Sequence, residues 1–161
     1  GDMLYLFYIA GKHWLASNDR PEPVYRIRGA RSKDGLHWER LGRDLIDVAL
    51  GPDEAQASPD VFERDGRFHM LFSYRRGLDY RGRNGSYRLG YATSDDLVTW
   101  HRQAGGGGLE PALEGWDADM IAYPHVFSVG TQTYLAYLGN GVGRDGFGLA
   151  ELVAWTPSGG S

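Results

Sequence analysis

The segment Ser58-Pro59-Asp60-Val61-Phe62 returns as Tyr123-Pro124-His125-Val126-Phe127, 65 residues further along the chain. Each copy continues into a polar turn and then an aromatic-rich segment, at residues 68–74 and 133–138. Residues 3–9 form an earlier copy of that segment, and aligning Phe7 with Phe72 gives the same spacing. Recurrence at a fixed period indicates a repeat architecture.

A second pair of segments repeats with nearly the same period. Residues 25–38 begin Tyr-Arg-Ile and end in Trp, and residues 87–100 begin Tyr-Arg-Leu and also end in Trp, 62 positions later. Asp34-Gly35 and Asp95-Asp96 lie inside them and suit two-residue hairpin centres, because Gly and Asp tolerate positive φ. A shorter third version occupies residues 146–150. Each repeat unit therefore contains several short strands joined by tight turns.

We letter the four strands of one unit A to D in chain order. The chain then contains three successive units, with strands B-C-D in the first, A-B-C-D in the second and A-B-C in the third. This arrangement predicts ten strands, with a proline near the start of each A strand, where a missing N–H donor is harmless. Four-stranded antiparallel units of this period are typical of propeller blades. The content of ten Tyr, five Trp, six Phe and 24 Gly fits short strands with tight turns. We therefore predict an all-β fold, a partial β-propeller of fewer than three blades.

We assign residues 1–161 to one partial propeller domain. It comprises an incomplete blade at 1–48, a complete blade at 49–104 and an incomplete blade at 105–161. Closed propellers need about four to eight blades, and an open ring leaves bare sheet edges. We therefore expect either a part of a longer protein or a ring completed by further copies, of which a homodimer is the simplest.

Charge and composition exclude several classes of function. The formal charge of −4 argues against nucleic acid binding, which needs a basic face. No run approaches the ~18 apolar residues of a membrane span, so we expect a soluble protein without a membrane partner. The chain has no cysteine, which excludes disulfides and thiolate metal sites and fits the cytoplasm, our expected location. Five histidines without ligand-like spacing give no metal-ligand set, so metal use stays open, and we expect no cofactor.

Two acidic residues occupy the same place in successive repeats. Glu54 and Asp119 each lie five residues before the proline of an A strand, and A strands line the central channel of a propeller. Packed blades lie about 10 Å apart and converge on the axis, so two such carboxylates would approach the ~5–10 Å separation used in glycosidic hydrolysis. Asp117 is an alternative acid. Acidic residues in turns before strands also serve as simple caps, which is the competing interpretation.

Several other residues are candidates for binding a ligand. Arg75 and Asn140 lie at the ends of equivalent strands. Arg75 would bind a carboxylate or phosphate through bidentate hydrogen bonds, or form an ion pair with Asp79. His69 alternates with buried neighbours and is interpreted as a core histidine. An exposed Trp116 would stack on a sugar, or it would fill a gap between blades. The substrate-binding candidates are Gln56, Asp60, Arg75, Trp116, His125 and Asn140.

The chain resembles the five-bladed propeller superfamily of arabinanases, levansucrases and invertases, glycoside hydrolase families 32, 43 and 68. The resemblance rests on residues 51–59, residues 87–92 with Trp100, residues 115–124, and residues 139–141 and 146–150. The closest resemblance is to poorly characterised bacterial glycosidase homologues, of which the chain would form roughly the C-terminal half. It implies a five-bladed ring and a sugar pocket at the channel mouth, with three acids acting as base or nucleophile, pKa-tuning group and general acid.

The sequence departs from the characterised hydrolases in one respect. They have an acidic residue one or two positions before the A-strand proline, where this chain has Ala57 and Ser58, then Ala122 and Tyr123. Its acids lie five positions before the proline, as in the poorly characterised subgroup, and the blades that would supply the remaining acid lie upstream of Gly1.

We therefore expect a glycoside-hydrolase-like protein acting on a glycan, with Glu54 and Asp119 as acid/base carboxylates. On this hypothesis, Glu54→Gln or Asp119→Asn abolishes glycosidase activity and leaves the fold intact. The alternative is a non-catalytic carbohydrate-binding or assembly module. The two differ in whether the Glu54 and Asp119 carboxyl groups converge on an open pocket.

Overall fold

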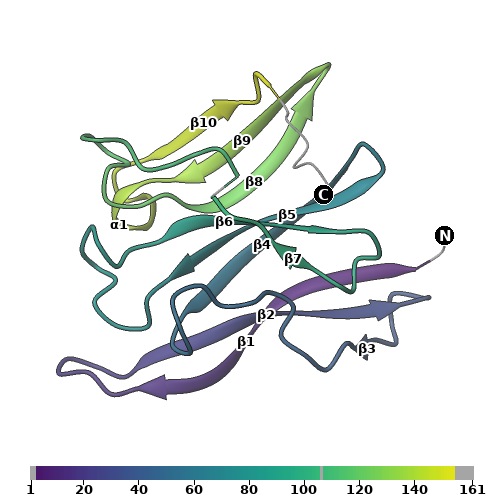
Figure 1. Cartoon of the computed structure of the whole chain (residues 1–161), viewed down its shortest axis with the longest axis horizontal. Coiled ribbons are helices and arrows are strands. Elements are labelled where there is room, and N and C mark those ends of the chain that lie inside the picture. The colour runs from purple at the N-terminus through teal and green to yellow at the C-terminus, as the bar shows by residue number, and fades with distance from the viewer. Residues whose placement is uncertain (1–2, 106, 155–161) are drawn as a thin grey trace.

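The computed structural model describes residues 3–105 and 107–154, which form three antiparallel sheets (Figure 1). The fold is all-β, as predicted, and the strands follow the predicted order. The first sheet contains β1 (Leu4–Leu15), β2 (Glu22–Ser32) and β3 (Glu39–Arg40). The second contains β4 (Ala55–Arg64), β5 (Arg67–Arg75), β6 (Arg88–Ser94) and β7 (His101–Arg102). The third contains β8 (Ala122–Val129), β9 (Gln132–Leu138) and β10 (Phe147–Glu151), with a single helical turn α1 (Asn140–Gly143) between β9 and β10.

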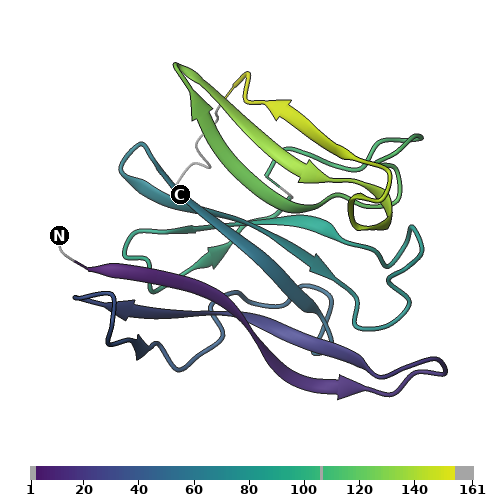
Figure 2. The same cartoon turned by 180° about the vertical axis from the view of Figure 1, so that it is seen from behind.

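The three sheets fan out as successive blades of a propeller (Figures 1 and 2). β4 and β8 are terminal strands of their sheets and pack against each other, while β2 packs against β4. This arrangement confirms the predicted partial propeller. The number of blades in a closed ring and the blade boundaries stay predictions, and residues 155–161 of the third blade lie outside the described residues. No described helix has the length and apolar character needed to cross a membrane.

The repeated prolines lie at β-bulges in β4 and β8, the terminal strands that pack against each other and are called the inner strands below. The register of β4 shifts between Ala57 and Asp60, and that of β8 shifts between Ala122 and His125. Within the bulges Ser58 (φ 48°) and Tyr123 (φ 55°) adopt the left-handed conformation, which is uncommon for residues other than glycine. Because bulged residues leave the hydrogen-bond ladder, a proline there loses no strand bond. The repeat seen in the sequence is therefore a repeated kink beside the propeller axis.

The predicted two-residue hairpin centres are wrong, because longer loops stabilised by an aspartate join these strands. The first loop is residues 33–38, where Asp34 Oδ1 accepts the backbone N–H groups of Leu36 and His37 at 2.9 and 2.8 Å. Asp96 accepts the matching N–H groups in residues 95–100, at 2.8 and 2.6 Å. These donors, Thr99 N–H first, lower the pKa of Asp96 to about 2.

The predicted alignment of the first strand is also wrong, by one residue. Phe7 lies opposite Gly29, whereas Phe72 lies opposite Gly90. Tyr25 and Tyr87 are equivalent at a spacing of 62, so at the same spacing the equivalent of Gly29 is Tyr91. Tyr91 lies opposite Leu71 in the second sheet. The counterpart of Phe7 is therefore Leu71, and a slip of one residue moves every side chain to the other face of the sheet.

The core lies between the blades rather than inside one sheet. Ile27 of the first sheet joins Met70, Phe72 and Trp100 of the second blade in one buried cluster. A smaller cluster of Leu89, Ile121 and Tyr137 joins the second and third blades. Burial of these apolar side chains stabilises the stacking of blades and holds the starts of β4 and β8 together.

Candidate functional site

Most of the predicted site residues gather where β4 and β8 begin and β5 and β9 end. Two equivalent arginines hold the backbone at this end. Arg26, at the start of β2, donates to the carbonyl oxygens of Pro52 and Glu54. Arg88, at the start of β6, donates to the carbonyl oxygen of Asp119 at 2.8 Å. The equivalence of positions 54 and 119 thus has a structural cause, because the backbone carbonyl of each accepts a hydrogen bond from an arginine of the preceding blade.

The Glu54 side chain is completely buried, with 0% relative exposure. Its Oε1 accepts Arg102 Nη1 at 2.7 Å and Gln56 Nε2 at 2.9 Å. Its Oε2 accepts the backbone N–H groups of Ala49 and Leu50 at 2.8 and 2.9 Å. Four donors occupy the carboxylate, so it anchors β7 and the loop before β4 and faces no open pocket.

Gln56 belongs to the same interior network. Its Nε2 also lies 3.2 Å from the Ile46 carbonyl oxygen, and the whole side chain is buried. Its Oε1 has no hydrogen-bond partner among the described residues. Gln56 therefore stabilises the contact between the first two blades, and its buried amide is not presented to a ligand in this structure.

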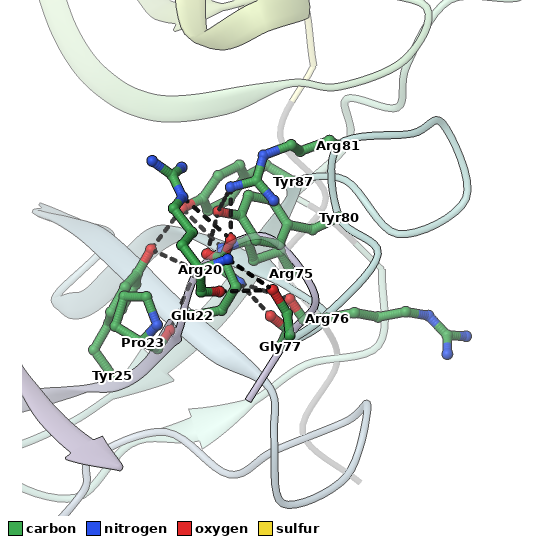
Figure 3. A network of polar contacts seen from close by, with 11 residues as sticks. Arg20, Glu22, Pro23, Tyr25, Arg75, Arg76, Gly77, Tyr80, Arg81 and Tyr87 are labelled. Atoms are coloured by element: carbon green, nitrogen blue, oxygen red, sulfur yellow. Dashed lines mark hydrogen bonds and ion pairs between the residues drawn. The ribbon is translucent and has the colours of Figure 1, made fainter. Parts of the chain in front are cut away.

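Arg75 lies inside a cage of tyrosines, with 2% relative exposure (Figure 3). Nη1 donates to the Arg76 and Gly77 carbonyl oxygens, at 2.7 and 3.2 Å. Nε donates to the Tyr87 hydroxyl, and Nη2 donates to the Tyr25 hydroxyl and the Pro23 carbonyl oxygen. Five contacts account for the five N–H donors of a guanidinium. Arg75 thus ties the first two sheets together and has no donor left for a ligand.

The sequence-based reasoning missed the tyrosines around this arginine. The hydroxyls of Tyr25 and Tyr87 lie 2.6 Å apart, and burial followed by this hydrogen bond raises the pKa of Tyr25 to about 12. Tyr87 also contacts the ring of Tyr123, with centroids 5.9 Å apart. The recurrence of Tyr25 and Tyr87 was visible in the sequence, but nothing local indicated that their side chains meet.

Glu22 completes the polar network in Figure 3. Its buried carboxylate accepts the Tyr80 hydroxyl at 2.7 Å and Arg81 Nη2 at 2.6 Å. These hydrogen bonds, that of Tyr80 first, lower the pKa of Glu22 to about 2. The loop between β5 and β6 is thereby fastened to the first sheet.

In the third sheet, Asn140 organises the loop that leads into β8. Its Oδ1 accepts the backbone N–H groups of Asp119 and Met120 at 2.8 and 3.2 Å, and its Nδ2 donates to the Gly115 carbonyl oxygen. Asp119 itself is exposed, and its carboxylate makes no hydrogen bond or ion pair with the part of the chain that the structure describes. Asp119 is thus available to a ligand, and Asn140 positions its backbone.

Asp117 and Trp116 pack against the third sheet. Asp117 accepts the Tyr137 hydroxyl at 2.9 Å, and the Trp116 ring stacks on Tyr137 with centroids 5.5 Å apart. Gly139 and Gly148 lie against the same indole, so tightly that a Cβ at either position would clash with it. Trp116 therefore packs on its own sheet rather than between blades, and 37% of the residue stays exposed.

Asp60 and His125, at matching positions directly after the two prolines, contact each other across the inner strands. His125 Nδ1 lies 3.1 Å from Asp60 Oδ1, and the Val126 N–H donates to Asp60 Oδ2 at 2.7 Å. The His125 side chain is 67% exposed and that of Asp60 is 21% exposed. His69, in contrast, is buried and bonded to Tyr91 and Arg64, as expected of a core histidine.

Two clefts lie away from the predicted residues. One of about 530 Å³ separates the second and third sheets, and one of about 510 Å³ lies between β1 and β4. Neither is lined by any of the predicted catalytic or binding residues. Among residues 3–105 and 107–154, no group of three His, Asp or Glu side chains is placed to hold a metal ion.

Comparison with known proteins supports the fold. No family model matches the chain. It is 36% identical over 152 residues to the uncharacterized protein Rv1502 of Mycobacterium tuberculosis strain H37Rv, and equally to MT1551 of strain CDC 1551. These matches cover 94% of the chain, which spans about half the length (48%) of these curated relatives.

Similar solved structures are glycoside hydrolases. One described as a glycoside hydrolase is similar over 98% of this chain and 43% of its own, with a TM-score of 0.69 and 19% identity. A thermostable family-43 glycoside hydrolase has a TM-score of 0.61 at 15% identity, over 89% of this chain and 54% of its own. A Bombyx mori GH32 β-fructofuranosidase has a TM-score of 0.60 at 17% identity, over 87% of this chain and 28% of its own. The chain therefore has the fold of the propeller-type glycoside hydrolases.

Proposed function

We propose that this chain forms a glycan-binding site in a glycoside-hydrolase-like propeller. The site lies at the entry to β8. The observation that carries the proposal is that two residues beside the start of β8 are exposed: Asp119, whose carboxylate makes no hydrogen bond or ion pair with the described residues, and Tyr123, which is 39% exposed. An exposed aromatic ring stacks on the apolar face of a sugar, and a carboxylate accepts its hydroxyl groups.

The similar solved structures support the substrate class, because they include glycoside hydrolases, one of them a β-fructofuranosidase. In this chain, however, Glu54 is enclosed by four donors, so Asp119 has no partner carboxylate at the equivalent position. By the criterion of converging carboxyl groups, glycan binding is favoured over hydrolysis by Glu54 and Asp119.

Calorimetric titration with a panel of arabino-, xylo- and fructo-oligosaccharides tests the proposal. We expect Tyr123→Ala and Asp119→Asn each to weaken binding of the best ligand at least about tenfold, since each removes a contact of roughly 1–2 kcal/mol. Glu63→Gln, which changes an exposed acid at the far end of β4, serves as the matched control and keeps wild-type affinity. Absence of binding to every oligosaccharide, or unchanged affinity in both site variants, would contradict the proposed function.

A further inference from the structure

Asp60 and His125 form a contact between the inner strands that is separate from the carboxylates at positions 54 and 119. We infer that His125 is a catalytic proton acceptor of the glycan site and that Asp60 is its positioning residue. This inference rests on the proposed function. It explains how the site would act on a glycan although Glu54 is enclosed.

The Asp60 carboxylate is itself firmly held. One oxygen contacts His125 Nδ1 at 3.1 Å, and the other accepts the Val126 N–H at 2.7 Å. The two contacts come from adjacent residues of β8, so they fix the carboxylate relative to the imidazole. The ring also stacks on Phe127, with centroids 5.9 Å apart and an interplanar angle of 20°. Few orientations of the His125 ring satisfy all of these contacts.

The contact with Asp60 determines which ring nitrogen is free. A carboxylate accepts a hydrogen bond, so the proton of neutral His125 resides on Nδ1 and Nε2 keeps its lone pair. Nε2 has no hydrogen bond to the described residues, and the side chain is 67% exposed. This is the arrangement by which a carboxylate prepares an imidazole to accept a proton.

The other histidines are arranged differently. His13 contacts the Asp53 carboxylate through Nε2, at 2.9 Å, so its Nδ1, and not its Nε2 as in His125, is the nitrogen that does not face the carboxylate. His37 uses Nδ1, but its partner Asp34 belongs to a loop far along the chain from the inner strands. His101 is exposed on β7 and is not ion-paired within the described part of the chain. His125 combines the required tautomer with a place on an inner strand.

The pair lies close along β8 to Tyr123 of the proposed glycan site, across the register shift between Ala122 and His125. His125 lies two residues after Tyr123, and both are exposed while the intervening Pro124 is buried. Asp60 reaches the same region from β4, two residues after Ser58. The repeated kink therefore presents the stacking ring and the imidazole along one strand.

The step would proceed as a single displacement by water. Nε2 of neutral His125 takes a proton from water while the water oxygen bonds to the anomeric carbon. The glycosidic C–O bond breaks, and the departing oxygen takes a proton from a solvent water molecule. The imidazolium is stabilised by the Asp60 carboxylate, and exchange of protons with solvent restores the neutral imidazole.

Hydrolysis of a panel of nitrophenyl glycosides by the 161-residue chain tests the inference. We expect His125→Gln to lower kcat about 100-fold or more, with KM changed less than about twofold, because general bases contribute roughly 10²–10⁴-fold. We expect Asp60→Asn to lower kcat at least about tenfold and to move the His125 proton to Nε2, visible by nitrogen NMR. His101→Gln, the matched control, keeps the wild-type kcat.

The outcomes separate this inference from the proposed function. A wild-type chain that binds oligosaccharides but hydrolyses none of the glycosides overturns the pair and leaves the glycan site standing. Full activity in His125→Gln also overturns it. If the variants fail to fold, carbethoxylation of the wild-type chain by diethyl pyrocarbonate tests whether His125 is needed for hydrolysis. Activity lost in step with modification of His125, and preserved by bound oligosaccharide, supports the pair, whereas activity that survives the modification refutes it.

Discussion

At the scale of single residues, positions 54 and 119 show that equivalent places in a repeat can have different roles. Both carbonyl groups are held by an arginine of the preceding blade. The Glu54 carboxylate is enclosed by Arg102 and backbone N–H donors, whereas that of Asp119 is open. A buried carboxylate with a full set of donors holds the fold, and only an accessible one meets a ligand.

Glu54→Gln is therefore expected to destabilise the protein, in contrast to the sequence-based expectation of an intact fold. Loss of the negative charge leaves the partly buried Arg102 guanidinium without its ion-pair partner, and breaking a buried pair costs about 3–5 kcal/mol. Urea unfolding followed by circular dichroism measures the change. Glu63→Gln, an exposed change on the same strand, should leave the unfolding midpoint where it is. Equal midpoints for Glu54→Gln and wild type would show that the ion pair is not structural.

At the scale of elements, the match between β5 and β6 depends on the absence of a side chain at Gly90. Gly90 lies opposite Phe72, and the Phe72 ring lies in the space that a Cβ at Gly90 would occupy. Phe72 is fully buried between the first and second sheets. The glycine therefore lets the Phe72 ring lie directly against β6.

Gly90→Ala tests this packing. The added methyl group must displace the Phe72 ring in a closely packed core, which costs about 1–3 kcal/mol. We expect the urea midpoint to fall, and Phe72→Leu combined with Gly90→Ala to recover part of the loss. Gly11→Ala in β1 is the matched control, because no atom lies within 4 Å of its Cβ position. A stability loss in Gly11→Ala as large as in Gly90→Ala would argue against a packing cause.

At the scale of the whole molecule, the outermost sheets present apolar side chains to solvent. Leu4 and Leu6 of β1 are exposed, as are Phe147 and Leu149 of β10. Inside the molecule, each sheet covers the apolar face of its neighbour. Exposed faces of this kind mark surfaces that associate.

We propose that a second copy covers these faces, as the expected homodimer requires. Light scattering should give about twice the chain mass at micromolar concentration, because the buried apolar area stabilises association. Replacing Phe147 and Leu149 by serine should shift the protein to the monomer, while the exposed change Glu63→Gln should not. A wild-type mass of one chain at every concentration would count against the homodimer.

The sequence alone determined the propeller, the strand order and the positions of both inner strands, because alternation and repeat spacing are local properties of the chain. It also identified Ser58-Pro59-Asp60 and Tyr123-Pro124-His125 as equivalent. Only the tertiary structure decided that Glu54 is enclosed, that Arg75 is occupied by tyrosines, and that Asp60 reaches His125. Those outcomes depend on which side chains meet across blades, and sequence spacing does not contain that information. The one-residue slip of Phe7 has the same cause, since the register of a strand is set by its partner.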